Sequence, residues 1–279
     1  MSGAKGNPIE VPEELLSFYN ELAVIQDKLL ESALIPEQKV EEEEIRQHRT
    51  ERKFWLQILK FPEVLKGFRE NIRVMAEFTK NNRPQIAEQI NQIMEAIENE
   101  DLTEILDRTV WLDTQYFDRL AHEKGLSAGL IVFLVENALR PYLRAWGQEL
   151  IKYLDEDNWL KPICPICGHK ARISRLRPGD GSRLMFCTHC FTEWQYRHLF
   201  CPHCENEDPM SLNIITIEGD EVDQIYTCDK CKGYLKTIND KQGGLSRNML
   251  VESARTFFLD LLAEREGFSQ PLDDRTKLN

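Results

Sequence analysis

The sequence predicts an α+β protein in which an N-terminal α-helical domain precedes two small β modules of the zinc-ribbon type and a C-terminal helix. Apolar residues recur at helical spacing in the first half, strand-like alternation follows, and all eight cysteines lie within residues 164–231. At roughly 150 residues per domain, 279 residues also favour about two larger units. The expected segments are a helical domain over 1–157, a first metal ribbon over 158–198, a second over 199–242, and a closing helix and tail over 243–279.

The charge is acidic and unevenly distributed. The chain carries a net charge of −12, and residues 1–157 account for −11 of it. Acidic surfaces repel phosphate backbones and anionic lipids, so nucleic-acid and membrane partners are disfavoured. The apolar run 129–135 is far shorter than the ~20 residues of a membrane-spanning helix. No signal-peptide pattern is found at the N-terminus, so we expect a cytoplasmic protein.

Prolines mark the beginning of four helical stretches in the first domain. Proline lacks an amide N–H but is tolerated in the first turn of a helix. The fourth stretch has the clearest pattern, because its isoleucines recur at spacings of four, three and four and so share one buried face. The prolines are Pro12, Pro36, Pro62 and Pro84, and the isoleucines are Ile86, Ile90, Ile93 and Ile97.

Three more helical stretches complete this domain. One is expected over 101–124, where Gly125 interrupts the pattern. Ser127 can cap the next helix, and Pro141 must end or kink it because proline clashes with the preceding turn. A last helical piece reaches about Leu154.

Strand signals replace helical spacing beyond residue 158. Residues 214–217 and 222–227 read as a hairpin around a Glu-Gly-Asp turn. A second turn is expected over 177–181, where Pro and Gly alternate with charged residues. Ser246 can cap the closing helix, whose apolar positions run over 249–262.

The cysteines form four Cys-x-x-Cys pairs separated by gaps of 19, 10 and 23 residues. Two cysteines at this spacing can direct both sulfur atoms to one point, which supplies half of a tetrahedral S₄ site. Each long gap reads as strand, turn and strand, and the short gap reads as a link between two ribbons. Four such pairs within one short segment strongly indicate metal binding.

The sequential pairing places the first two pairs on one ion and the last two on another. A cross-braced pairing, first with third and second with fourth, also fits and stays open here. Disulfides are disfavoured without export, and redox Cys-x-x-Cys motifs follow a strand and begin a helix, whereas these pairs flank hairpins. The predicted metal ligands are Cys164, Cys167, Cys187, Cys190, Cys201, Cys204, Cys228 and Cys231.

The ligand set does not decide the metal. All-cysteine sites suit zinc and iron alike: zinc would be structural, whereas a single iron could carry an electron, and an iron–sulfur cluster is a weaker alternative. Because eight thiolates complete two sites, His169, His189 and His203 are expected beside the ligands rather than among them. The predicted cofactors are therefore two metal ions, iron or zinc, each held tetrahedrally by four cysteines.

Several short segments around the cysteine pairs follow one another in a characteristic order along the chain. The segments are Cys164-Pro165-x-Cys167-Gly168, Gly181-x-Arg183-Leu184, Cys187-x-x-Cys190, Glu193-Trp194, Arg197 before Cys201-x-x-Cys204, Cys228-x-x-Cys231-x-Gly233-Tyr234-Leu235-Lys236 and Leu259-Asp260-x-Leu262-Ala263. This order resembles the formate dehydrogenase accessory (formation) protein family. The resemblance extends over about residues 125–268, and over the first 100 residues it rests on helical character alone.

The resemblance implies two rubredoxin-like modules and a cytoplasmic maturation factor that binds the catalytic subunit of a formate dehydrogenase and assists its assembly or activation. The sequence offers no catalytic triad, phosphate loop or paired-carboxylate motif, so we expect no turnover by the chain itself. A metal-ribbon adaptor on nucleic acid and a redox enzyme are the alternatives. The ribbon segment 158–242 is charge-neutral, which disfavours the adaptor. The oligomeric state stays open.

Overall fold

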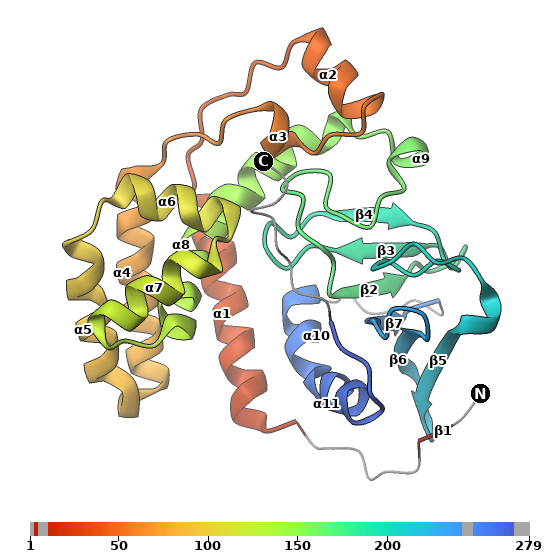
Figure 1. Cartoon of the computed structure of the whole chain (residues 1–279). Helices are drawn as coiled ribbons and strands as arrows, with labels where there is room; N and C mark the ends of the chain where they lie inside the picture. The colour runs from red at the N-terminus through yellow and green to blue at the C-terminus, as the bar shows by residue number, and fades with distance from the viewer. Residues whose placement is uncertain (1–2, 5–10, 242–247, 271–279) are drawn as a thin grey trace. The chain divides into compact units, whose positions relative to one another are not determined.

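The computed structural model of the chain describes residues 3–4, 11–241 and 248–270. A helical N-terminal region, a mixed sheet and closing helices confirm the predicted α+β class (Figure 1). The chain forms two compact units. One includes Val40–Ile58 and the sheet, and the other includes Val24–Lys39 and Leu59–Glu149. The domain boundaries predicted at residues 157, 198 and 242 stay predictions.

Helices make up most of the described chain before residue 160. They are α1 (Glu13–Glu31), α2 (Glu42–Arg49), α3 (Trp55–Ile58), α4 (Leu65–Asn82), α5 (Ala87–Glu98), α6 (Leu102–Trp111), α7 (Thr114–Lys124), α8 (Ala128–Leu150) and α9 (Glu156–Trp159), with 3-10 turns at Pro84–Ile86 and Ile151–Tyr153.

Two details of the helical prediction were wrong. The stretch 101–124 is two helices, because Leu112 takes a left-handed φ of 53° and the Asp113 side chain accepts a hydrogen bond from the Tyr116 N–H, which begins α7. The stretch expected from Pro36 becomes helical only at the beginning of α2. Pro141 was expected to end its helix or to kink it. The helix does not end there, because Pro141 lies inside α8.

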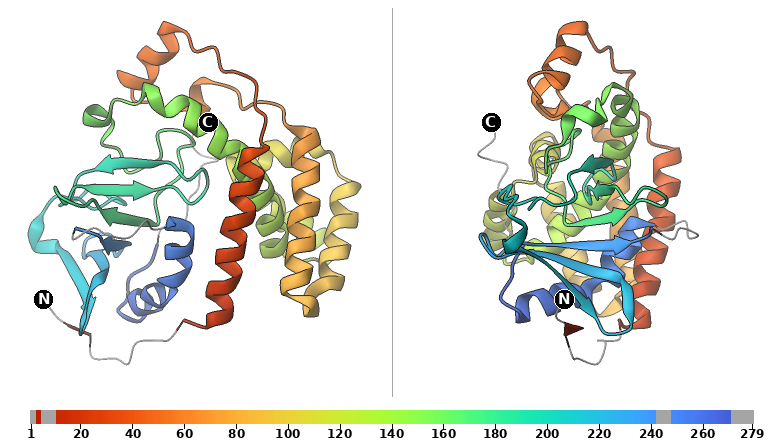
Figure 2. Two further views of the ribbon diagram at one scale, coloured as in Figure 1. Left: turned by 180° about the vertical axis from the view of Figure 1, so that it is seen from behind. Right: turned by 90° about the vertical axis from the view of Figure 1, so that its right-hand side faces the viewer.

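The helical unit has an apolar core of its own. Helix α4 contacts both α5 and α6, and α4 and α5 lie side by side (Figure 2). Ile90 and Ile93 of α5 are fully buried and Ile97 is nearly so, whereas Ile86 is partly exposed. The predicted isoleucine stripe is thus buried at three of its four positions.

Within the described residues the sheet has seven strands, in the order β1-β5-β6-β7-β2-β3-β4. The strands of the first ribbon are antiparallel neighbours, and so are β5, β6 and β7 of the second. Both predicted turns join paired strands as expected. The bounds are β1 (Gly3–Ala4), β2 (Ile173–Leu176), β3 (Arg183–Phe186), β4 (Glu193–Tyr196), β5 (Leu212–Ile217), β6 (Asp220–Cys228) and β7 (Tyr234–Asn239).

The two ribbons share one sheet, a feature that the sequence did not predict. Strand β2 pairs in parallel with β7, and the buried hydroxyls of Ser174 and Thr237 lie 2.9 Å apart across this junction. Ile173 and Phe186 of the first ribbon pack with Ile238 of the second in one apolar cluster. The ribbons therefore share a core as well as a hydrogen-bond ladder.

Two short helices, α10 (Met249–Arg255) and α11 (Phe257–Arg265), stand where one helix was expected. Asn248 caps α10 through its side chain, and the predicted cap Ser246 lies outside the described residues. Helix α11 contacts β6 and β7. The buried Lys236 ammonium lies 2.8 Å from an Asp260 oxygen, which ties α11 to the sheet.

No helix within residues 11–241 or 248–270 is both long enough and apolar enough to cross a membrane.

Candidate metal centres

Each of the four Cys-x-x-Cys pairs forms the same backbone turn. The N–H four residues after the first cysteine donates to that cysteine's carbonyl at 2.8–2.9 Å, and the cysteine's own N–H donates to the carbonyl five residues on at 2.8–3.0 Å. The residue four positions on has a left-handed φ between 54° and 73°. These residues are Gly168, Phe191, Glu205 and Lys232.

Only glycine adopts this φ freely, and an L side chain there costs roughly 1–2 kcal/mol. Three of the four turns therefore carry backbone strain at Phe191, Glu205 and Lys232. This shared turn was not predicted from the sequence, although Gly168 directly after the first pair was one signal for it.

The first cluster consists of Cys164, Cys167, Cys187 and Cys190, whose sulfur atoms all lie within 4.8 Å of one another. The Sγ atoms of Cys164 and Cys190 are 3.4 Å apart, and the Sγ of Cys167 lies 3.5 Å and 3.6 Å from those of Cys187 and Cys190. All four side chains are buried. The first two pairs thus meet at one enclosed point.

The second cluster consists of Cys201, Cys204, Cys228 and Cys231. The Sγ separations are 3.6 Å between Cys201 and Cys231 and 3.7 Å between Cys204 and Cys228. Cys201 and Cys228 are buried, but Cys231 is partly exposed and Cys204 is exposed. The last two pairs meet in the same way at a more open point.

Both clusters fit a four-coordinate metal. A tetrahedral ion with metal–sulfur bonds of about 2.3 Å places its sulfur ligands about 3.8 Å apart, close to the separations found here. Backbone N–H groups also point at the sulfur atoms: those of His203 and Gly233 donate to Cys201 and Cys231 at 3.4 Å and 3.3 Å. The grouping is sequential, so the geometry does not support the cross-braced alternative.

The three nearby histidines lie outside both four-cysteine sets. The rings of His169 and His189 stack with centroids 5.7 Å apart beside the first cluster. His203 donates from Nε2 to the Tyr234 carbonyl at 2.7 Å, beside the second cluster. Within the described residues each candidate centre therefore offers sulfur ligands only.

The thiols of the first cluster differ in the direction in which their pKa is shifted. Burial raises the pKa of Cys164 and of Cys187 well above the usual range. Burial also opposes ionisation of Cys167, but hydrogen bonds from the three neighbouring thiols outweigh it and lower the pKa of Cys167. A metal ion would replace this sharing of protons with direct bonds to thiolates.

In the second cluster, too, burial raises the pKa of the thiols while hydrogen bonds to the sulfur atoms lower it. Burial raises the pKa of Cys231 to about 11. At Cys228 burial is outweighed by the backbone N–H groups of Cys231 and Lys230 and by the neighbouring thiols, which lower the pKa to about 7. Hydrogen bonding to its sulfur therefore favours the thiolate form of Cys228.

A segment from the N-terminal half covers the first cluster. The backbone N–H groups of Trp55 and Leu56 donate to the carbonyls of Pro165 and Ile166 at 3.0 Å and 3.1 Å, inside the first Cys-x-x-Cys pair. The ring of the buried Phe54 lies so close to Gly168 that a Cβ there would approach ring carbons at 2.6 Å. We call residues 52–56 the covering segment.

His48 anchors the covering segment in an aromatic stack. Its ring lies between those of Trp55 and Trp159, with centroid distances of 4.6 Å and 5.2 Å, and Nδ1–H donates to the Lys53 carbonyl at 2.8 Å. Burial lowers the pKa of His48, so the imidazole is neutral at pH 7. These residues were not predicted from the sequence, because a covering role depends on contacts between distant segments.

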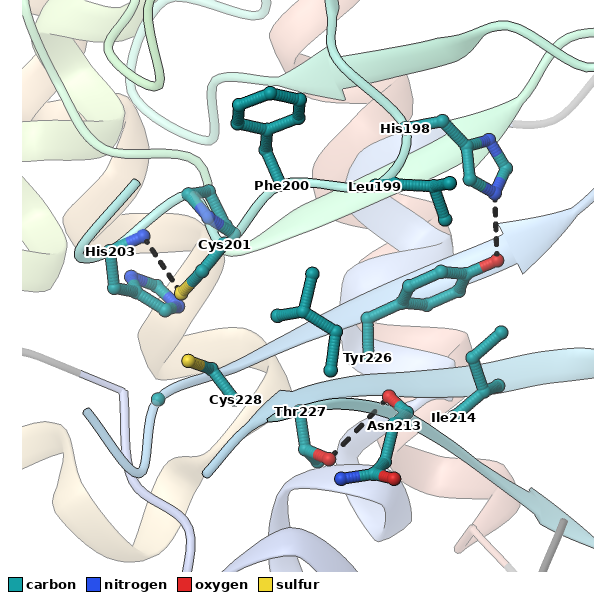
Figure 3. Close-up of a pocket in the computed structure, with 13 residues that line it drawn as sticks. His198, Leu199, Phe200, Cys201, His203, Asn213, Ile214, Tyr226, Thr227 and Cys228 are labelled. Carbon is teal, nitrogen blue, oxygen red and sulfur yellow. Dashed lines mark hydrogen bonds between the residues drawn. The ribbon is translucent and has the colours of Figure 1, made fainter. Parts of the chain in front are cut away.

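A mostly apolar pocket lies beside the second cluster. Figure 3 shows Cys201 and Cys228 at one end of this pocket and the His198–Tyr226 pair at the other. The Tyr226 hydroxyl and the His198 Nε2 are 3.3 Å apart. Leu199, which is 63% exposed, also lines the pocket. The second cluster thus adjoins an apolar hollow.

The chain is similar in sequence to several curated proteins named FdhE homologs. The chain is 33% identical to the Protein FdhE homolog of Aquifex aeolicus over 150 residues, which are 52% of each chain. It is 26% identical to the Shewanella baltica (strain OS223) homolog over 153 residues, and 24% identical to the Haemophilus influenzae homolog over 199 residues. No family model matches.

The crystal structure of the FdhE protein from Pseudomonas aeruginosa is also similar. It superimposes with a TM-score of 0.57, covers 92% of this chain and 91% of its own, and is 20% identical in sequence. The resemblance to the formate dehydrogenase accessory family is confirmed. The similarity to the crystal structure extends to the fold of almost the whole chain, whereas the chain spans about half the length of the first curated FdhE homologs that it matches.

Proposed function

We propose that this FdhE-like chain is an accessory factor that binds the catalytic subunit of a formate dehydrogenase and assists its assembly or activation. The observation that carries the proposal is the pair of all-cysteine clusters in a chain that resembles FdhE proteins. We place this work in the cytoplasm, where a catalytic subunit is synthesised. The chain performs no turnover of its own in this account.

In the same proposal the eight cysteines hold two metal ions, iron or zinc. Four thiolates around one ion bind tightly and cross-link segments that are distant in sequence, and iron would add the ability to carry one electron. Cys164 and Cys190, for example, belong to Cys-x-x-Cys turns on either side of the β2–β3 hairpin. A metal ion bound by both turns would hold the two ends of this hairpin together and so fix the surface of the ribbon.

Affinity capture tests the partner. The tagged chain is expressed at its natural level in its own cells, captured, and the co-purifying proteins are identified by mass spectrometry. We expect the catalytic subunit of a formate dehydrogenase, and we expect less of it with a Cys164→Ser and Cys228→Ser double variant. Recovery of nucleic acid or transcription proteins without that subunit would contradict the proposal and favour the nucleic-acid adaptor.

Deletion of the gene tests the role. Formate dehydrogenase activity should fall while the catalytic subunit is still synthesised, and the wild-type gene should restore it. Unchanged activity in a deletion strain without a second copy of the gene would defeat the maturation role.

A further inference from the structure

The two cysteine clusters differ in how far their surroundings shield them. Every residue from Cys164 to His169 is buried, and the facing pair Cys187 and Cys190 is buried as well. In the second cluster Cys204 and the adjacent Glu205 are exposed, as are Asp229 and Lys230 between the last two cysteines. The same turn is therefore closed in one cluster and open in the other.

The closure of the first cluster has an identifiable cause. The covering segment, residues 52–56, donates two backbone hydrogen bonds to the first knuckle and places the Phe54 ring on Gly168. Because all four cysteines are buried, an incoming ligand must displace surrounding groups before it can reach the sulfur atoms, and the covering segment is one of these groups. Mutation of groups that orient metal ligands from outside typically changes metal affinity by about 10–100-fold.

The second cluster has two open approaches instead. One is the solvent face at Cys204, and the other is the apolar pocket that Cys201 and Cys228 line (Figure 3). The pocket is bordered by Leu199, so a donor group carried on an apolar side chain has a surface to lie against. A soft donor such as a thiolate can approach from either side.

We propose that the second cluster, Cys201, Cys204, Cys228 and Cys231, is an exchangeable metal centre open to an incoming soft donor ligand, and that the first cluster is a closed structural centre. This inference rests on the proposed metal binding. In such an exchange the incoming donor would replace the exposed Cys204 at the metal: one bond from the metal to the donor would form as the bond from the metal to the Cys204 sulfur breaks, and no electron would be transferred.

Zinc release from the full-length chain tests the proposal. The protein is loaded anaerobically with two equivalents of zinc and mixed with excess 4-(2-pyridylazo)resorcinol, and the coloured zinc complex is followed with time. We expect two phases of one equivalent each, with rates that differ by at least about tenfold. Quenching with N-ethylmaleimide followed by peptide mass spectrometry should place the fast phase at the second cluster.

Equal rates for the two ions, or a fast phase that maps to Cys164, Cys167, Cys187 and Cys190, would overturn this inference while leaving metal binding intact. Failure to bind any zinc or iron in a folded chain would instead defeat the proposed metal binding. The two failures are therefore distinguishable.

A variant of the covering segment sharpens the assignment. Phe54→Ala removes the ring from Gly168 and should accelerate the slow phase without changing the fast phase. Its matched control is Phe61→Ala, which removes a buried ring that packs on Trp146 in the helical unit. Both variants are first shown to hold two zinc ions. An unchanged slow phase in Phe54→Ala would contradict the assigned cause of closure.

Discussion

The helical unit and the sheet unit use different means to stay folded. The helical unit buries large apolar side chains along several helices, among them Phe68, Met75, Ile93, Ile105, Leu134 and Trp146, all fully buried. The sheet unit also buries apolar side chains, for example in the cluster around Ile225, Tyr234 and Leu259, and adds eight cysteines gathered at two points.

The two units therefore differ in how their stability is distributed over the residues. Apolar burial contributes roughly 25 cal/mol per Å² and is spread over many residues, so one substitution removes only a part of it. A four-cysteine metal centre concentrates its contribution at one atom. Each unit should therefore respond to a different kind of perturbation.

Metal removal should have the largest effect. Structural zinc in small domains contributes about 10–16 kcal/mol of apparent binding free energy. Chelation under reducing conditions should abolish amide protection in β2–β7, while protection in α4, α5 and α8 persists. Hydrogen exchange with mass spectrometry measures both in one sample. Full protection of the strands in protein shown to be metal-free would remove the distinction between the units.

Single ligand substitutions should have the next largest effect. Cys164→Ser and Cys228→Ser each replace a buried cysteine that is a predicted metal ligand, one in each cluster. Each variant should lose one of two metal equivalents, because the clusters do not share ligands. Elemental analysis of the purified variants measures the loss. Loss of both equivalents from either variant would show that the clusters depend on each other through the shared sheet.

A core substitution should affect the helical unit alone. Ile93→Ala removes a fully buried side chain and should lower the free energy of unfolding of that unit by about 2–5 kcal/mol. Both metal equivalents should be retained. Ile86→Ala, at the partly exposed position of the same stripe, is the matched control and should cost less. Thermal unfolding followed by circular dichroism compares the two, and equal losses would argue against the assigned core.

The smallest expected effect concerns backbone strain in the second cluster. Glu205 has a φ of 54° and an exposed side chain. Glu205→Gly should raise the stability of the sheet unit by up to about 1 kcal/mol, because glycine adopts this φ freely. Glu207→Gly, an exposed position without a left-handed φ, should lower it slightly. Chemical denaturation of the metal-loaded proteins resolves the sign, and a loss in both would refute the strain.

The sequence predicted the features that depend on local spacing. The isoleucine stripe of α5, both hairpins and the two sets of Cys-x-x-Cys pairs are all encoded within a few residues of chain. The break at Leu112 was missed, because a leucine with a left-handed φ leaves no pattern in the sequence.

Long-range pairings could not be predicted in this way. The parallel ladder between β2 and β7 joins Ser174 to Thr237, far apart in the sequence, and nothing in either strand specifies its partner. The covering segment joins Trp55 to Pro165 through backbone atoms, which carry no side-chain signal. The grouping of the cysteines was therefore predictable, whereas the surroundings that distinguish the two clusters were not.

The metal content of the folded chain decides whether the eight cysteines hold two metal ions. The protein is purified anaerobically from its own cells, and metal per chain is determined by elemental analysis together with thiol titration. We expect two equivalents of iron or zinc per chain, and thiols that react fully only after the metal has been removed. A folded chain with metal content near zero and eight freely titratable thiols would contradict it.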